Sequence, residues 1–257
     1  MVLTKLGTLY RKWENWILPA LFVLLLLLLL GLRFDYYYDL NDDVLMKDIL
    51  SGVYTGAFES RNVQMLFPLS LILSFVCRIF GTSYVYGLFL CICQFGSLYV
   101  ILYRSMGYAE KSMGKAALGL LESLLFAALL LPQLVFVQYT VTSGLLTAAA
   151  IFWFLTGKKA EAEKSAGGFL KKNLPPVLLC ILAFLLRPEM LILLLPLAGL
   201  LKHRLAAVGA ILGSGNLPGH KAALLALFAS IVGIAPLALP LEHAGAALGA
   251  APGHPLG

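Results

Sequence analysis

The sequence predicts an all-α polytopic membrane protein with about six or seven transmembrane helices. The 257 residues are 60% hydrophobic and only 12% charged, and their mean hydropathy is +0.90. Soluble domains contain about 25% charged residues. Apolar runs recur along the whole chain, and a spanning helix needs about 20 predominantly apolar residues. These observations leave no room for a separate soluble domain, and the net charge of +6 is interpreted as Lys and Arg of cytoplasmic loops rather than as nucleic-acid binding.

The first apolar run, Trp16–Leu32, predicts a signal anchor that stays in the mature protein. Lys5, Arg11 and Lys12 precede it, as they would precede a signal peptide. The run is longer than the usual core of a signal peptide, about 7–15 residues, and no small-x-small cleavage site follows. We therefore expect a multi-pass protein of the plasma membrane with a cytoplasmic N-terminus.

The positive-inside bias decides which later runs cross. These runs are Met65–Phe80, Tyr84–Tyr103, Ala116–Val137, Gly144–Leu155, Leu174–Leu186, Met190–Leu201 and Ala222–Leu239. If all of them cross, the basic stretches 104–115 and 158–172 lie outside, against the bias. If Met65–Phe80 is a juxtamembrane or re-entrant helix on the outer side, both stretches become cytoplasmic. That run is short and contains Pro68 and Arg78, so we prefer this topology, with an external turn at Gln138–Ser143.

The preferred topology places thirteen Lys and Arg residues in the cytoplasm and five outside, and Lys221 lies in the tail. It divides the chain into a membrane domain, 1–204, with an external loop and juxtamembrane helices over 33–83, and a tail, 205–257. The tail is rich in Ala, Gly, Pro and Leu. Its run 222–239 predicts one further span; the alternative is a truncated or altered reading of a longer gene.

The external loop begins with a predicted amphipathic helix, Asn41–Gly52. Asn41 suits the N-cap and Gly52 suits the residue after the last turn. Asp43 and Lys47 have the spacing of an i,i+4 ion pair. Its apolar residues recur every four positions and are expected to face lipid or protein: Leu45, Ile49 and Val53.

Asp42 and Asp43 are the first candidates for catalysis. Adjacent carboxylates at the mouth of a membrane protein are where an enzyme would keep a general base for a hydroxyl. The structural alternative is that both stabilise the first turn of the helix through its dipole, at about 0.3–1 kcal/mol each.

Four further charged residues are candidates for the site. Glu59 is a second acidic candidate and Arg61 a candidate for binding a lipid phosphate, since Arg presents paired donors; the alternative is a solvated loop. Arg187 and Glu189 flank Pro188 between two apolar runs. A local ion pair at a helix break and a contact with substrate are both open interpretations.

The order of these features resembles the GT-C superfamily of membrane glycosyltransferases. The resemblance covers Trp16 to Leu201: a signal anchor, acidic residues in a first external loop, Phe67-Pro68-Leu69, the turn Ile79-Phe80-Gly81-Thr82-Ser83, and a span that ends in Arg104. NDDVLMKDILSGVYTG with LFPLSLIL also resembles multi-spanning members of Gram-positive bacteria. Members of the superfamily usually have more spans than are expected here, which is consistent with the alternative that this chain is truncated.

The resemblance implies a polyprenyl-phosphate sugar donor, a glycan, lipid or protein acceptor, and transfer on the outer face of the membrane. In such enzymes an acidic residue of the first external loop is the base or a metal-bound carboxylate. That role falls to Asp42 or Asp43, with Glu59 next, and a divalent metal is the cofactor the resemblance allows. Many members also have an acidic residue at the next external turn, and Gln138–Ser143 has none.

The alternative function is a non-catalytic carrier or flippase of lipid-linked saccharides. A charge deep in a middle helix would favour it. Glu122 is the residue to weigh, and its position near the start of Ala116–Val137 predicts a place at the interface.

Overall fold

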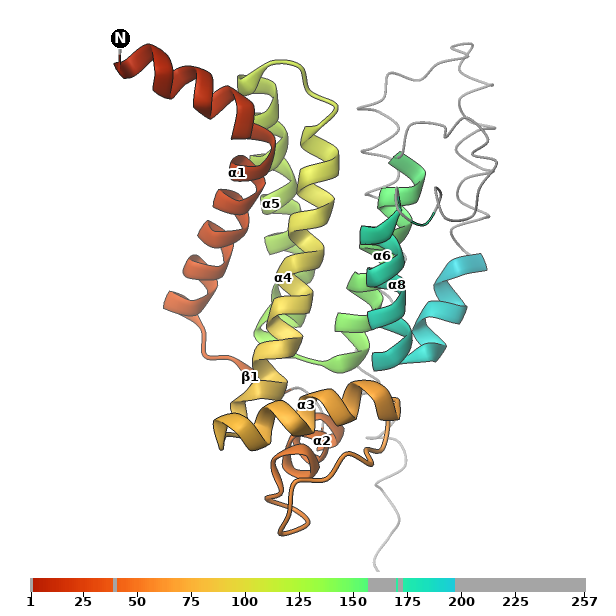
Figure 1. The fold of residues 1–257 in the computed structure, drawn as a ribbon. Coiled ribbons are helices and arrows are strands. Elements are labelled where there is room, and N and C mark those ends of the chain that lie inside the picture. Colours follow the sequence, from red (N-terminus) through yellow and green to blue (C-terminus); the bar gives the residue numbers. More distant parts are fainter. Residues whose placement is uncertain (1, 39–40, 157–169, 171–172, 197–257) are drawn as a thin grey trace, which may run out of the picture.

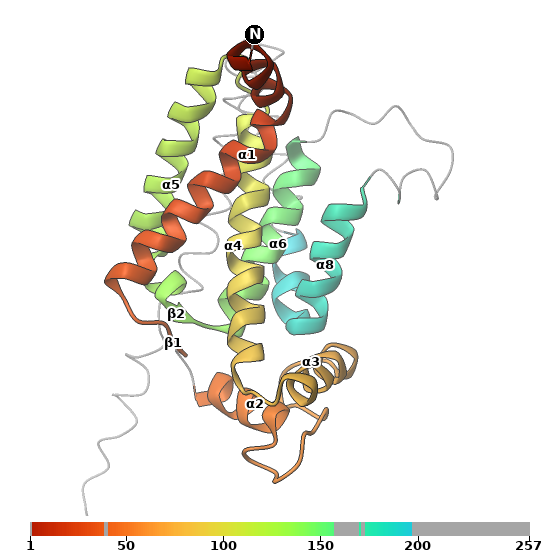
Figure 2. The same cartoon turned by 60° about the vertical axis from the view of Figure 1, so that its left-hand side comes forward.

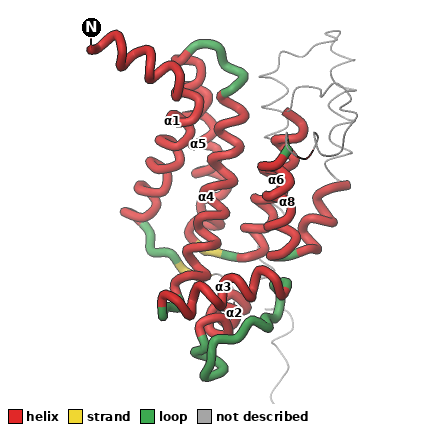
Figure 3. Tube along the Cα trace, viewed as in Figure 1, coloured by secondary structure: helices red, strands yellow, loops and turns green. Residues whose placement is uncertain are grey.

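The computed structural model describes residues 2–38, 41–156, 170 and 173–196. The predicted tail, 205–257, therefore lies outside the described residues. Almost all of the described trace is helical, with two short strands (Figure 3). The helices are α1 (Val2–Arg33), α2 (Asn41–Ser51), α3 (Phe67–Phe80), α4 (Tyr84–Met106), α5 (Ser112–Val135), α6 (Tyr139–Thr156) and α8 (Leu174–Leu186), and residues 188–196 are also helical.

Three of the described helices are long and apolar enough to cross a membrane: Glu14–Arg33 within α1, and the whole of α4 and α5. The apolar helices α6 and α8 are shorter. Helix α4 packs against α1, α5 and α6, and α6 packs against α8. The long helices run side by side as a bundle in Figure 1. The structure thus supports an all-α membrane protein, and the number of six or seven spans stays a prediction.

Helix α3 lies across the end of the bundle and does not run beside α4 and α6 (Figure 1). At 1.5 Å per residue its 14 residues are too short for the bilayer core of about 30 Å. Pro68 starts the helix without losing a hydrogen bond. Gly81 ends it, with a positive φ of 61° and its N–H bonded to the Cys77 carbonyl. The chain can therefore turn sharply into α4.

Helix α2 has the predicted bounds, and Gly52 follows it with a φ of 77°. The buried residues of α2 are Asp43, Met46, Ile49 and Leu50, because this face packs on α3 and α4. Of the predicted apolar residues, Ile49 is thus buried, whereas Val53 is 70% exposed. The predicted ion pair of Lys47 is wrong. Lys47 pairs with Asp48 at 3.0 Å instead of Asp43.

The predicted turn at Gln138–Ser143 is also wrong, because α6 begins at Tyr139. The Thr142 N–H and hydroxyl both bond the Gln138 carbonyl, at 3.0 and 2.8 Å. Buried Gln94 of α4 donates to the Thr142 hydroxyl oxygen at 3.1 Å. Because these hydrogen bonds satisfy the polar groups of Gln138 and Thr142 inside the protein, the segment can be helical. Helix α6 therefore begins five residues before the apolar run Gly144–Leu155.

A parallel pair of two-residue strands joins the loop after α1 to the segment after α5. Tyr37 and Tyr38 of β1 (Tyr37–Tyr38) pair with Phe136 and Val137 of β2 (Phe136–Val137). Figure 2 shows β1 and β2 side by side near the starts of α2 and α4. We call this end of the bundle, which carries α2 and α3, the α2–α3 end. The strand pair brings two loops that are far apart in the sequence to this end.

Candidate functional site at the α2–α3 end

Asp43 is the point where three helices meet. Its side chain is fully buried. Its Oδ1 accepts a hydrogen bond from the Tyr86 hydroxyl at 2.7 Å and another from the Tyr139 backbone N–H at 3.1 Å. Tyr86 lies in the first turn of α4 and Tyr139 is the first residue of α6. Because a helix N-terminus has unpaired N–H groups and a positive dipole end, it is a favourable partner for this carboxylate.

Tyr139 is held in place by the strand pair. It follows β2 by two residues, so the pairing of β2 with β1 fixes where α6 starts. The Tyr139 residue is buried and belongs to a cluster that includes Met46 of α2 and Leu186 of α8. The Tyr139 N–H bond to Asp43 therefore joins the start of α6 to α2.

Arg187 approaches Tyr139 from the end of α8. Pro188 disfavours a helical conformation at the residue before it, and Arg187 is extended, with a φ of −158°. Its guanidinium lies 5.1 Å from the centre of the Tyr139 ring and donates to the Thr140 hydroxyl. Its carbonyl accepts from the Ser143 hydroxyl at 3.2 Å. A cation over an aromatic face is a stabilising arrangement.

Asp42 precedes Asp43 in the first turn of α2 and is partly exposed, unlike Asp43. Asp42, Asp43 and Arg187 all act electrostatically on the Tyr139 hydroxyl. The structure therefore brings together Asp42, Asp43 and Arg187 from opposite parts of the chain. We call these three residues with Tyr139 the Tyr139 cluster.

Glu189 lies at the edge of the Tyr139 cluster. Its carboxylate is 3.8 Å from Arg187 Nε, and its side chain is 70% exposed. The ion pair at the helix break that the sequence left open is thus present. It is long and largely exposed, and such pairs contribute little to stability.

Glu59 and Arg61 are not part of the Tyr139 cluster in the described contacts. They lie in the loop between α2 and α3, which extends away from the bundle in Figure 1. Glu59 Oε1 accepts the backbone N–H groups of Ser60 and Arg61 at 2.8 and 3.0 Å. The N–H bonds, first that of Arg61, hold the pKa of the exposed Glu59 carboxyl below its usual value. These two hydrogen bonds indicate that Glu59 stabilises the loop conformation.

Tyr38 supports the cluster from the strand side. Its ring stacks on Tyr86, with centres 5.9 Å apart, and Lys47 Nζ lies 5.9 Å from its centre. A Cβ at Gly87 would lie 2.6 Å from the Tyr38 hydroxyl, so a larger residue there would displace the Tyr38 ring. Burial first, and then the charge of Asp43, raises the pKa of Tyr38 to about 12.

Sequence reasoning missed Tyr38, Tyr86, Tyr139 and Thr140 as site residues. Tyrosines near the ends of apolar runs are typical of an interfacial belt, which hides any other role. The signal that could have found two of them is position, because Tyr86 and Tyr139 each lie in the first turn of a helix, near the acidic loop in the predicted topology.

The described residues contain no group of three or more His, Cys, Asp and Glu side chains with a metal-binding arrangement. The described residues alone thus form no metal site, and no chemical step is assigned to a metal. The chain matches no family model, no curated protein and no solved structure. Its function is therefore argued from the geometry of the Tyr139 cluster.

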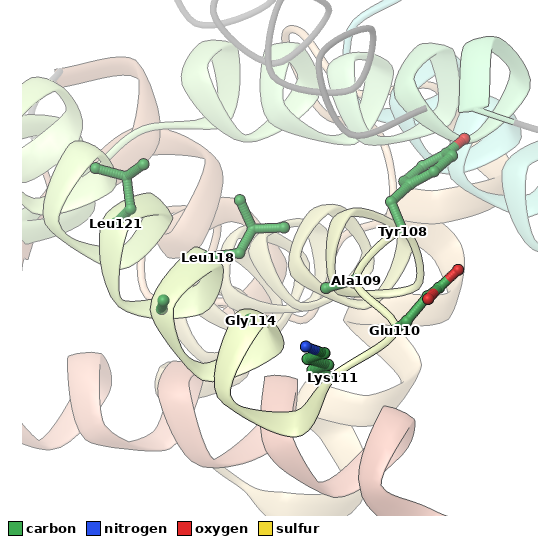
Figure 4. Close-up of a pocket in the computed structure, with 8 residues that line it drawn as sticks. Tyr108, Ala109, Glu110, Lys111, Gly114, Leu118 and Leu121 are labelled. Carbon is green, nitrogen blue, oxygen red and sulfur yellow. The ribbon is translucent and has the colours of Figure 1, made fainter. Parts of the chain in front are cut away.

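A groove of about 640 Å³ lies at the opposite end of the bundle, between the α4–α5 loop and α5. Figure 4 shows Leu118 and Leu121 on one side and Tyr108, Glu110 and Lys111 on the loop. None of the predicted site residues lines it. The groove is mainly apolar with one cation and one anion near each other, so it offers no chemistry comparable to that of the Tyr139 cluster.

Proposed function

We propose that the protein is a membrane glycosyltransferase that moves a sugar from a polyprenyl-phosphate donor to a hydroxyl acceptor on the outer face of the membrane. The observation that carries the proposal is that Tyr139 joins Asp43, through its backbone N–H, to Arg187, which lies over its ring. Asp42, the residue before Asp43 in the first turn of α2, is thereby held at the same end of the bundle as Arg187. A base and a phosphate-binding cation are the two groups that this reaction needs from a protein. They lie next to the ends of apolar helices, where a lipid-linked donor carries its phosphate.

Asp42 is the base in this proposal. It is partly exposed, whereas Asp43 is fully buried and already accepts two hydrogen bonds. The acceptor hydroxyl gives its proton to Asp42, and its oxygen bonds the anomeric carbon. The bond from that carbon to the phosphate oxygen breaks on the opposite face, so the configuration inverts. Asp43 holds α2 in position and is a positioning residue.

Arg187 stabilises the phosphate that leaves. Its guanidinium has five N–H donors, and its described hydrogen bond is the one to Thr140. Guanidinium groups bind phosphate through paired donors, and a fixed donor is most effective where charge develops in the transition state. Glu189 is the exposed partner that a phosphate would displace, because its ion pair is long.

The test replaces Asp42 by Asn, which keeps the shape and removes the charge. Membranes that contain the protein are supplied with radiolabelled polyprenyl-phosphate sugars, and transfer to endogenous acceptors is measured. We expect Asp42→Asn to insert normally and to lose about 10²–10⁴ in rate. Asp48→Asn is the matched control, because Asp48 lies on the same helix and pairs only locally with Lys47. Parental transfer by Asp42→Asn would refute the assignment.

A carrier or flippase of lipid-linked saccharides is the second candidate, and one observation favours it. Glu122 is fully buried within α5, a helix that can cross the membrane. Ionisable groups inside membrane helices often mark transport pathways. Movement of a fluorescent lipid-linked saccharide across vesicles that contain the protein, without sugar transfer, would support this candidate over the enzyme.

A further inference from the structure

Glu122 lies inside the protein, between α4 and α5. Its side chain is fully buried, and it accepts a hydrogen bond from the hydroxyl of Ser105. Ser105 belongs to the last turn of α4, so the contact joins α4 to α5 at the end opposite the α2–α3 end (Figure 1). The proposed glycosyl transfer makes no use of this carboxyl.

Apolar packing closes the space around the carboxyl. One turn earlier on α5, a Cβ at Gly119 would overlap side-chain atoms of Met106 and Phe22. Helices α4 and α1 therefore both pack closely against α5 at this point. One turn later, Phe126 is fully buried in the same core. A surrounding bilayer would add hydrocarbon to the outside of these helices and no water.

In the part of the chain that the structure describes, no cation compensates a negative charge at Glu122. Within the described part of the chain, only burial and the Ser105 hydroxyl act on this group. The cations of α5 and α4, Lys115 and Arg104, have other partners. Lys115 of α5 pairs with Glu14 of α1 at 3.5 Å, and Arg104 of α4 donates to the Thr156 hydroxyl and stacks over Trp153.

The two oxygens of the carboxyl differ. Oε1 has Ser105 as its partner, and Oε2 has no hydrogen-bond partner among the described residues. An ionised carboxylate with one partner and no cation is strongly unfavourable in an apolar interior, and such a group binds a proton instead. A neutral acid needs fewer partners, and Ser105 can either donate to it or accept its O–H.

We propose that Glu122 is an intramembrane proton-binding site, occupied at neutral pH, in which a neutral carboxylic acid is hydrogen-bonded to Ser105. The site couples a protonation equilibrium to the packing of α4 against α5. It is separate from the Tyr139 cluster, so it stands whether or not the protein transfers sugars. A bound proton within the membrane is also what a proton-coupled carrier needs.

Infrared difference spectroscopy on the reconstituted protein tests the proposal directly. The parent minus Glu122→Gln difference at neutral pH should contain the C=O band of a protonated carboxyl, shifted in D₂O. Glu14→Gln is the matched control, because Glu14 is also buried but faces Lys115. Its difference spectrum should contain the bands of an ionised carboxylate. Carboxylate bands in the Glu122→Gln spectrum would overturn the proposal.

A second variant keeps the test decisive if Glu122→Gln fails to insert. Ser105→Ala removes the partner and leaves the acid, so the protonated C=O band should persist and move to the frequency of a less strongly bonded acid. Loss of that band, with a gain of carboxylate bands, would show that Glu122 is ionised in the folded protein. Thermal stability gives an independent readout: Glu122→Gln should melt within a few degrees of the parent, because a neutral amide replaces a neutral acid.

Discussion

The hydroxyl of Tyr86 donates a 2.7 Å hydrogen bond to Asp43, and both side chains are fully buried. The bond links the first turn of α2 to the first turn of α4. Because a buried carboxylate needs its partners, this pair fixes how α2 lies on the end of the bundle. The partly exposed neighbour Asp42 is held at this end of the bundle by the same attachment.

Tyr86→Phe should therefore destabilise the protein by about 1–3 kcal/mol, the cost of leaving a buried polar group with one partner fewer. Thermal unfolding in detergent, followed by circular dichroism, measures the change. Tyr84→Phe is the control, because Tyr84 is 81% exposed and lies in the same turn. Equal melting of Tyr86→Phe and the parent would show that Asp43 does not depend on this bond.

Local signals made the ends of α2 and α3 predictable. Gly52 and Gly81 both have positive φ values, and Pro68 stands in the first turn of α3. Such residues end or begin helices through their own backbone preferences, which need no knowledge of the rest of the fold. The prediction that Met65–Phe80 does not cross the membrane followed from the distribution of Lys and Arg in the loops and from the short length of this run. The structure places α3 across the bundle end, and the side of the membrane stays a prediction.

The partners of Asp43 could not be predicted in the same way. Tyr86 and Tyr139 are distant in sequence, and tyrosine at a helix end has several ordinary roles. Which face of α2 is buried was decided by tertiary packing: Met46 and Leu50 are fully buried, while the predicted stripe ends in exposed Val53. The choice of Asp42 rather than Asp43 as the base likewise depends on which of the two is buried. The sequence does not show this for two adjacent residues.

Alkaline pH should destabilise the protein through Tyr38. Its pKa is raised from 10.0 to about 12 in the folded chain, first by burial and then by Asp43. A phenol with a raised pKa stabilises the fold below the unfolded value, and this stabilisation is lost as the pH rises through the folded value. We expect Tyr38 to account for ~1–2 kcal/mol between these pH values, after discounting solvent screening of a half-exposed group.

The measurement is the pH dependence of unfolding in the parent and in Tyr38→Phe, followed from neutral pH to about the folded pKa. The parent should lose more stability over this range than the variant, because the variant has no proton to release. Other tyrosines titrate in both proteins, so only the difference between the two curves reports on Tyr38. Parallel curves would contradict the assignment.

The outer face of α3 should lie in the hydrocarbon boundary of the membrane. Leu71, Phe75 and Ile79 share this face and are 48–61% exposed, while Leu73 and Cys77 on the other face are buried. The exposed residues Tyr84, Leu88 and Ile92 extend the apolar surface onto α4, a candidate span. Phe75→Trp, in a background with Trp13, Trp16 and Trp153 changed to Phe, reports the depth by fluorescence quenching.

Brominated lipids should quench the tryptophan at position 75, and aqueous iodide should not. Tyr54→Trp in the same background is the control. Tyr54 is 69% exposed in the loop that extends from the bundle, so iodide should quench it and the lipids should not. If iodide quenches both positions equally, α3 faces water and its apolar surface is covered by something other than lipid.

Lys47 and Lys111 should lie on opposite sides of the membrane. Lys47 belongs to α2, and Lys111 belongs to the α4–α5 loop at the other end of the bundle (Figure 1). The positive-inside bias places Lys111 in the cytoplasm, together with Lys164, which lies outside the described residues, and it places Lys47 outside.

Single-cysteine labelling probes each side of the membrane. The background lacks Cys77, Cys91, Cys93 and Cys180, and the variants are Lys47→Cys, Lys111→Cys and Lys164→Cys. In intact cells an impermeant maleimide should label position 47 only, and permeabilised cells should also label 111 and 164. Labelling of 111 and not 47 from outside would invert the topology and place Asp42 in the cytoplasm. Labelling of both from outside would mean that α4 does not cross, which would remove the membrane boundary from the proposed site.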